Sequence, residues 1–85
     1  MGRVMTDQPG REIPKDYREV ATYLVNVLGW RYKVGRRGQH PKLYPADAAQ
    51  PVLSVPTTPS DARAFANFVA NVRRRGGHWP PAGRR

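Results

Sequence analysis

Two stretches of the sequence carry apolar side chains at spacings of three and four residues, and strand-like sequence separates them. Between residues 14 and 28 the apolar positions are Tyr17, Val20, Ala21, Leu24, Val27 and Leu28. Between residues 59 and 75 they are Ala62, Phe65, Ala66, Val69 and Val72, with Phe68 beside them. This spacing places the apolar side chains on one face of a helix. Each of the two helices must therefore bury one stripe against another layer of the fold.

The residues at the ends of these stretches favour helix termini. Pro14 is suited to the first turn of a helix, where its missing N–H is not needed, and Gly29 can adopt the left-handed conformation that ends one. At the second helix, Thr58 is expected to be the N-cap, followed by Pro59 at the first helical position and Asp61 at the third.

The sequence between the helices predicts three short strands. Trp30, Tyr32 and Val34 alternate with Arg31 and Lys33, which is the period of a half-buried strand over residues 30–34. Residues 35–38 then form a turn, residues 39–44 a returning strand, residues 45–51 a loop bracketed by prolines, and residues 52–55 a third strand. The short connections predict antiparallel pairing of consecutive strands.

The predicted architecture is an α+β fold in the order helix, strand, strand, strand, helix. Two helices on one face of a three-stranded antiparallel sheet would bury both apolar stripes and leave the other sheet face open. With 85 residues the chain is expected to form one domain. We assign residues 1–12 to a flexible leader, residues 13–76 to the domain, and residues 77–85 to a basic, proline-rich tail.

Positive charge is concentrated in the second part of the chain. The formal net charge is +9, and the sequence pI is about 11.1. Residues 1–30 contain four basic and four acidic side chains, whereas residues 31–85 contain eleven basic and two acidic ones. Such a one-sided distribution favours a polyanionic partner, either RNA, DNA or an acidic protein. The alternative is a solvated basic tail that serves solubility alone.

Composition also excludes several classes of protein. The chain contains no cysteine, which excludes disulfides, thiolate metal sites and a cysteine nucleophile and fits a reducing cytoplasm. No apolar run approaches the roughly 20 residues that span a bilayer, and the N-terminus lacks the apolar region of a secretory signal. We therefore expect a cytoplasmic protein. No second histidine or acidic cluster lies at ligand spacing from His40, so we expect no metal and no other cofactor.

The cations of the predicted hairpin form the first candidate binding surface. Arg31, Lys33, Arg36, Arg37 and Lys42 lie within twelve positions of one another. If the strand alternates, Arg31 and Lys33 share the open face and can contact phosphates, while Trp30 and Tyr32 pack beneath the helices. Tyr44 could stack on a base, although a tyrosine at the core or its rim is the simpler interpretation.

The end of the second helix offers further candidate contacts. Arg73, Arg74 and Arg75 either compensate the helix dipole or form a second phosphate-binding patch, and Gly76 and Gly77 end the helix. Trp79 follows in the tail, where it can dock on the domain or on a partner, and we favour the partner.

His40 is the only histidine in the predicted domain. An imidazole can accept or donate a proton near neutral pH, and RNA cleavage needs either a 2′-hydroxyl deprotonated or a leaving 5′-oxygen protonated. Arg36, Arg37 and Lys42 lie near enough in sequence to neutralise charge that builds on a phosphate. The alternative is an exposed strand residue without a chemical role.

The ordered set of these features resembles the HicA toxin family. The matching pieces are Gly29-Trp30, Gly38-Gln39-His40, Val52-Leu53-Ser54-Val55-Pro56 and the helix after Pro59, which together cover residues 14–76. The resemblance implies a double-stranded-RNA-binding-domain-like fold and the activity of an mRNA interferase from a toxin–antitoxin system. It also implies that His40 is required for cleavage, that Gly38 shapes the approach to it, and that an antitoxin protein is a partner.

Two functional hypotheses follow. The first is a HicA-like endoribonuclease that uses His40 without a metal. The second is a non-catalytic module on the same fold that binds nucleic acid or an acidic protein, and it is motivated by Pro41 and by the basic tail.

Overall fold

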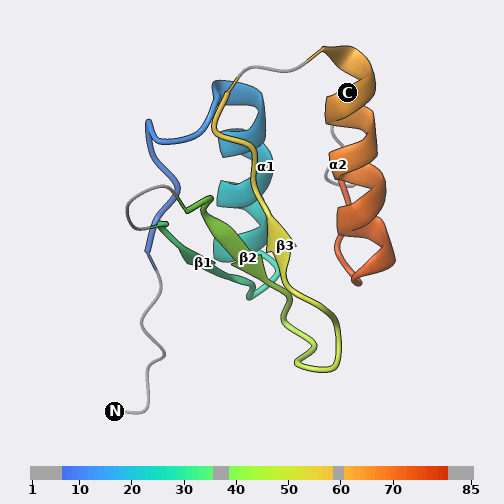
Figure 1. Cartoon of the computed structure of the whole chain (residues 1–85). Coiled ribbons are helices and arrows are strands. Elements are labelled where there is room, and N and C mark those ends of the chain that lie inside the picture. The colour runs from blue at the N-terminus through green and yellow to red at the C-terminus, as the bar shows by residue number, and fades with distance from the viewer. Residues whose placement is uncertain (1–6, 36–38, 59–60, 81–85) are drawn as a thin grey trace.

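The computed structural model describes residues 7–35, 39–58 and 61–80, and Figure 1 shows their arrangement. The elements are α1 (Lys15–Asn26), β1 (Arg31–Lys33), β2 (Lys42–Tyr44), β3 (Leu53–Ser54) and α2 (Ala62–Arg74). The predicted α+β fold and its element order are confirmed. Neither described helix is long and apolar enough to span a membrane.

The three strands form one antiparallel sheet in the order β1-β2-β3. Tyr32 of β1 lies opposite Leu43 of β2, which in turn lies opposite Leu53 of β3. These three side chains are buried, and their strand neighbours point to the other face because successive side chains alternate across a sheet. The sheet therefore has one face in the core and one face open.

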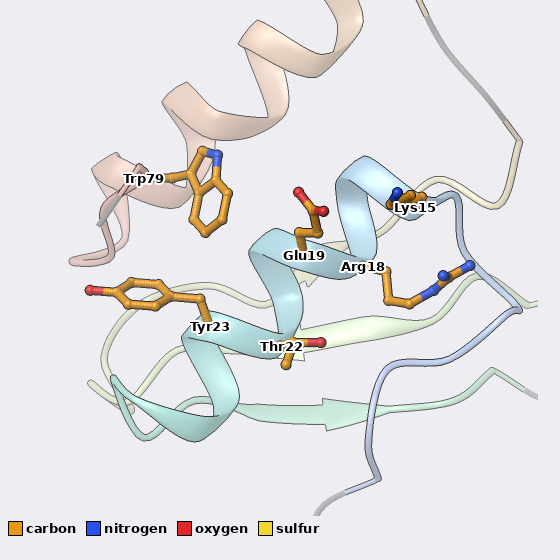
Figure 2. Close-up of a pocket in the computed structure, with 6 residues that line it drawn as sticks. All are labelled: Lys15, Arg18, Glu19, Thr22, Tyr23 and Trp79. Atoms are coloured by element: carbon orange, nitrogen blue, oxygen red, sulfur yellow. The ribbon is translucent and has the colours of Figure 1, made fainter. Parts of the chain in front are cut away.

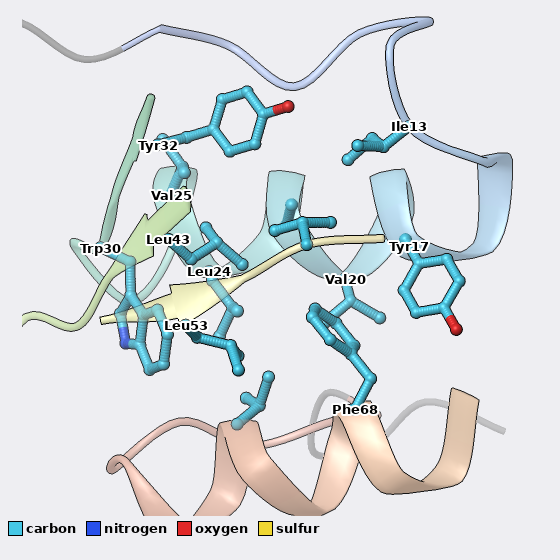
Figure 3. Packing of buried hydrophobic residues seen from close by; sticks show 13 residues of the cluster. Ile13, Tyr17, Val20, Leu24, Val25, Trp30, Tyr32, Leu43, Leu53 and Phe68 are labelled. Carbon is cyan, nitrogen blue, oxygen red and sulfur yellow. The ribbon is translucent and has the colours of Figure 1, made fainter. Parts of the chain in front are cut away.

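Both helices contribute to the core on the covered face of the sheet (Figure 3). From α1 the buried residues are Tyr17, Val20, Ala21, Leu24 and Val25, and from α2 they are Phe68, Val69 and Val72. Tyr17 makes edge-to-face contacts with Phe65 and Phe68, with ring centroids 5.4 Å and 4.9 Å apart. Trp30 is also buried, as predicted for a core anchor.

The buried stripes differ from the predicted ones at particular positions. Val27 was assigned to the first stripe but is 62% exposed, because α1 ends at Asn26 and the chain turns at Gly29, whose φ is +78°. Val25 is buried in its place. On α2, Ala62 and Ala66 are exposed, because α2 contacts the core through Phe68, Val69 and Val72 on a narrower face.

The predicted start of the second helix is wrong. The N-cap is Asp61, whose carboxylate accepts a hydrogen bond from the Ala64 backbone N–H at 2.9 Å, and not Thr58. An aspartate at this position satisfies an N-terminal amide and complements the helix dipole, so the helix begins at Ala62. Pro59, predicted at the first helical position, lies outside the described residues.

The strands are also shorter than predicted. Val34, placed on the buried face by its alternation with Lys33, is 40% exposed because β1 ends at Lys33. The second strand begins at Lys42 rather than at residue 39. Pro41 has no N–H to give, but its carbonyl accepts a hydrogen bond from Val55 at 2.9 Å, so the β2–β3 pairing extends to Pro41 and His40 precedes it.

Residues 7–12, which we assigned to a flexible leader, contact β1 and α1. The Tyr32 hydroxyl donates to Oε2 of Glu12 at 2.6 Å, and the Arg18 guanidinium donates to the carbonyls of Gly10 and Ile13 at 2.9 Å and 3.0 Å. Figure 3 shows the Tyr32 ring extending toward this segment. Burial by itself would raise the pKa of Glu12. The hydrogen bonds from Tyr32 and from backbone N–H groups, together with the charge of Arg18, outweigh burial, so the pKa of Glu12 is lowered. Burial and the Glu12 carboxylate in turn raise the pKa of Tyr32 above its usual value.

The chain also folds back after α2. The N–H of Gly76 donates to the carbonyl of Arg73, and the N–H of Gly77 donates to the carbonyl of Val72. These two bonds form a Schellman motif, in which Gly76 has a φ of +91°. The tail then reaches α1, where Nε2 of His78 and the Tyr23 hydroxyl are hydrogen-bonded at 2.7 Å. Trp79 packs partly buried against the core, so this residue docks on the domain.

Replacing each of the two buried tyrosines with phenylalanine tests how much each hydroxyl contributes to stability. Tyr32→Phe removes the hydrogen bond to Glu12, so we expect the free energy of unfolding at neutral pH to fall by about 1–2 kcal/mol. The Tyr17 hydroxyl is buried without a hydrogen-bond partner in the described part of the chain. Tyr17→Phe should therefore leave stability unchanged or raise it by up to about 1 kcal/mol. Urea denaturation of both variants measures the difference.

The effect of Tyr32→Phe should depend on pH. Because the pKa of Glu12 is lowered in the folded protein, its stabilising contribution is present above the ordinary carboxyl pKa and is lost as the pH falls through the lowered value. The stability difference between wild type and Tyr32→Phe should thus shrink below about pH 4. A difference that stays constant from neutral to acid pH would contradict this assignment.

The two glycines after α2 should tolerate substitution differently. A Cβ at Gly77 would lie 2.7 Å from Val72 and 3.0 Å from both Leu24 and Trp30, whereas a Cβ at Gly76 would meet nothing within 4 Å. Asparagine accepts positive φ better than most residues. We expect Gly77→Asn to lower the free energy of unfolding by about 1–3 kcal/mol and Gly76→Asn to cost less than about 1 kcal/mol, measured by thermal and urea denaturation. The reverse order would show that the tail does not lie against Leu24 and Trp30.

Candidate nucleic-acid interface

The open face of β1 and β2 brings together several residues that the sequence analysis selected. Arg31 and Lys33 are exposed on either side of the buried Tyr32. Arg31 lies opposite Tyr44 and Lys33 lies opposite Lys42 across the antiparallel pair. The predicted alternation of cations on one face and aromatic core residues on the other is thus present in β1.

Arg31 and Tyr44 form a cation–π pair on this face. The guanidinium carbon lies 5.9 Å from the centre of the Tyr44 ring. Tyr44 is 37% exposed, so it lies at the rim of the sheet and not in the core. The pair holds a planar cation beside a partly accessible aromatic ring, which are the two kinds of group on which nucleobases stack.

Lys33 and Lys42 are like charges directly opposite each other. Such a cross-strand pair is unfavourable unless other groups compensate. The Lys42 ammonium donates to the Ser54 hydroxyl of β3 at 3.3 Å, which holds it over the open face without adding negative charge. A phosphate between the two ammonium groups would relieve their repulsion.

His40 is exposed and lies beside these lysines. It shares a hollow of about 150 Å³ with Lys33, Lys42 and Tyr44, and the remaining lining residues are Val34, Gly35 and Gln39. A second hollow of about 210 Å³ is lined by Arg31, Tyr32, Lys33 and Tyr44. Lys33 and Tyr44 line both, so the two hollows adjoin across the β1–β2 pair. The imidazole is therefore placed where a ligand bound by the lysines would contact it.

The end of β1 is held by a residue that the sequence analysis did not select. The carboxylate of Asp7 accepts a hydrogen bond from the Val34 N–H at 2.9 Å, and the Asp7 N–H donates to the Tyr32 carbonyl at 3.0 Å. These bonds occupy the edge of β1 that faces away from β2. No local sequence signal marks Asp7, because its partners lie about 25 positions further along the chain.

The other predicted binding residues lie either at the end of α2 or outside the described residues. Arg36, Arg37 and Gly38 fall outside the described residues. The three arginines at the end of α2 lie on the helical side of the sheet, so the structure does not place them on the open face with Arg31 and Lys33. Arg73 donates to the Trp79 carbonyl at 2.6 Å, Arg75 donates to the Pro51 carbonyl at 3.0 Å, and Arg74 is exposed.

A larger hollow lies away from this face, between α1 and the tail (Figure 2). It measures about 390 Å³ and is lined by Lys15, Arg18, Glu19, Thr22, Tyr23 and Trp79. Its Arg18 guanidinium already donates to two backbone carbonyls, and Glu19 contributes an opposing charge. Because this hollow contains none of the predicted site residues and mixes both signs of charge, the open sheet face is the better candidate for binding a polyanion.

Within the described ranges, no group of three or more histidine and acidic side chains is positioned to hold a metal ion. Comparison with protein-family models, with curated proteins and with solved structures finds no match to this chain. The structure and the chemistry of the open face are thus the observations on which a functional assignment rests.

The opposition of Lys33 and Lys42 predicts a gain in stability when one charge is removed. We expect Lys33→Thr to raise the free energy of unfolding by about 0.3–1 kcal/mol at low salt, because it relieves the repulsion and threonine favours strands. The gain should diminish at high salt, where the charges are screened.

Arg31→Thr is the matched control for Lys33→Thr. It removes a cation from the same face of the same strand, but from a position opposite Tyr44. It should give no comparable gain in urea denaturation at low and high salt. An equal, equally salt-dependent gain in both variants would trace the effect to net charge and not to the lysine pair.

Proposed function

We propose that this chain is a HicA-like, metal-independent endoribonuclease that binds mRNA on the open face of β1 and β2 and cleaves it with His40. The observation that supports this most is the shared hollow in which the exposed His40 meets Lys33 and Lys42. The α-β-β-β-α order agrees with the fold that the family resemblance implies.

The cleavage step requires one proton to leave the 2′-hydroxyl and one to reach the departing oxygen. The 2′-oxygen attacks the adjacent phosphorus, the bond from phosphorus to the 5′-oxygen breaks, and the products carry a 2′,3′-cyclic phosphate and a 5′-hydroxyl. His40 would accept the 2′-hydroxyl proton or donate to the 5′-oxygen, and water would serve the other transfer. Lys33 and Lys42 would neutralise the charge that builds on the phosphate.

From the basic surface and the proposed activity we also infer the kinds of partner. A nuclease that degrades mRNA in the cell that makes it would act in the cytoplasm and need a neutralising antitoxin. An acidic antitoxin would be attracted to the same cations that bind RNA. Occupying the hollow that contains His40 would block cleavage.

A non-catalytic binding module is the second candidate. It is favoured by the His40 side chain, which makes no hydrogen bond to another residue within the described ranges that would fix its ring. Catalytic histidines are commonly oriented by such a partner. In this reading the lysines and Arg31 bind phosphates and His40 has no chemical role.

The two histidines of the chain allow a matched test of cleavage. His40→Ala should lower the rate of cleavage of a labelled single-stranded RNA by about 100-fold to 10,000-fold, the range for loss of a general acid or base. His78→Ala should keep the rate, because His78 contacts Tyr23 on α1, away from the open face. A 2′-deoxy substitution at the cleaved position should abolish cleavage by the wild type.

Equal RNA decay with wild type and His40→Ala would exclude the proposed activity. If neither protein cleaves but both bind RNA with affinity that falls steeply with salt, the binding module is the correct assignment. Expression of wild type and His40→Ala in cells tests the toxin role, since only the wild type should arrest growth.

A further inference from the structure

We propose that Arg31 and Tyr44 form a base-stacking subsite for a nucleotide next to the phosphate bound by His40, Lys33 and Lys42. This inference deepens the proposed function and rests on RNA binding at the open face. It assigns the substrate class as an extended single strand with unstacked bases.

Tyr44 lies at the boundary between the two adjoining hollows of the open face. It lines the hollow that contains His40 and also the hollow that contains Arg31. Along β2, Tyr44 is two residues from Lys42, which corresponds to roughly 7 Å of strand. That separation is comparable with the spacing of neighbouring phosphates in an extended strand. A phosphate at the lysines would thus leave an adjoining nucleotide beside the Tyr44 ring.

The stacking surface has both a ring and a planar cation. The guanidinium lies 5.9 Å from the Tyr44 ring centre, and Tyr44 is partly exposed. Bases stack on tyrosine rings and on arginine planes in many single-strand-binding proteins, with little dependence on sequence. The pair therefore offers a surface on which any of the four bases can stack, because stacking does not depend on base-specific hydrogen bonds.

The path continues beyond Arg31 into a third hollow. This hollow measures about 360 Å³, and its lining includes Arg31, Trp30, Pro45 and Ala46. Because Arg31 lines both this hollow and the one beside Tyr44, the three hollows follow one another from His40 to the loop after β2. Arg31 is the one cation in its lining, and it would contact the phosphate of a further unpaired nucleotide.

A duplex would not use these features. Bases inside a helix are already stacked, so they cannot reach the Tyr44 ring or the third hollow. Proteins that bind double-stranded RNA contact phosphates and 2′-hydroxyls across successive grooves over about 16 base pairs. The cations described on the open face are instead confined to two strands of three residues each.

The test measures binding in the His40→Ala background, which separates affinity from cleavage. The probe is a fluorescein-labelled single-stranded RNA octanucleotide, compared with the same octanucleotide annealed to its complement. Tyr44→Leu should weaken binding of the single strand by about 5-fold to 100-fold, and Tyr44→Phe should leave it unchanged. Tyr23→Leu is the control, since Tyr23 is an aromatic residue on α1, away from this face.

A set of octanucleotides with one abasic position each makes the test independent of how Tyr44→Leu folds. One abasic probe should bind the Tyr44-containing protein more weakly than the intact probe does. For that probe, Tyr44→Leu should cause no additional loss. Unchanged affinity of Tyr44→Leu for the intact probe, or duplex binding as tight as single-strand binding, would overturn the stacking subsite.

The outcomes for cleavage and stacking are separable. If His40→Ala cleaves as well as wild type while the Tyr44 effects hold, the nuclease assignment fails and the subsite stands. If His40→Ala abolishes cleavage and Tyr44→Leu changes nothing, the subsite fails and the nuclease assignment stands.

Discussion

Tyr32 determines which face of the small sheet is covered and which is open. Its ring packs in the core and its hydroxyl is bound by Glu12, so its neighbours Arg31 and Lys33 must point away from the core. A sheet of two- and three-residue strands has little stability of its own and depends on the helices and on residues 7–12 around it. Burial of the ring and exposure of the cations are two consequences of the same alternation.

The periodic parts of the fold could be predicted from the sequence. Both helices and the order of the three strands follow from apolar spacing, because that spacing reports which side chains face the core. The exact ends of the helices and strands could not be predicted. Both Thr58 and Asp61 can cap a helix, and the structure uses Asp61. The second strand begins only after Pro41, at Lys42. The contact of Glu12 was missed, and docking of Trp79 on the domain was considered but not favoured, because both contacts join distant segments without any periodic signal.

The candidate site was predictable to a similar degree. The exposure of Arg31 and Lys33 followed from strand alternation, but their partners depended on the register with β2. That register places Lys42 opposite Lys33 and Tyr44 opposite Arg31, and it cannot be read from either strand alone. The sequence left Tyr44 either in the core or at its rim, and the pairing shows that it lies at the rim beside Arg31.

The two ends of the described chain leave the domain from different sides. Asp7 is hydrogen-bonded along the edge of β1, next to the open face, whereas Trp79 lies against Tyr23 of α1 (Figure 2). A fluorophore or a surface-coupling group attached at residue 7 would crowd the cationic face. The same group attached at residue 79 would lie beside α1 and leave that face accessible.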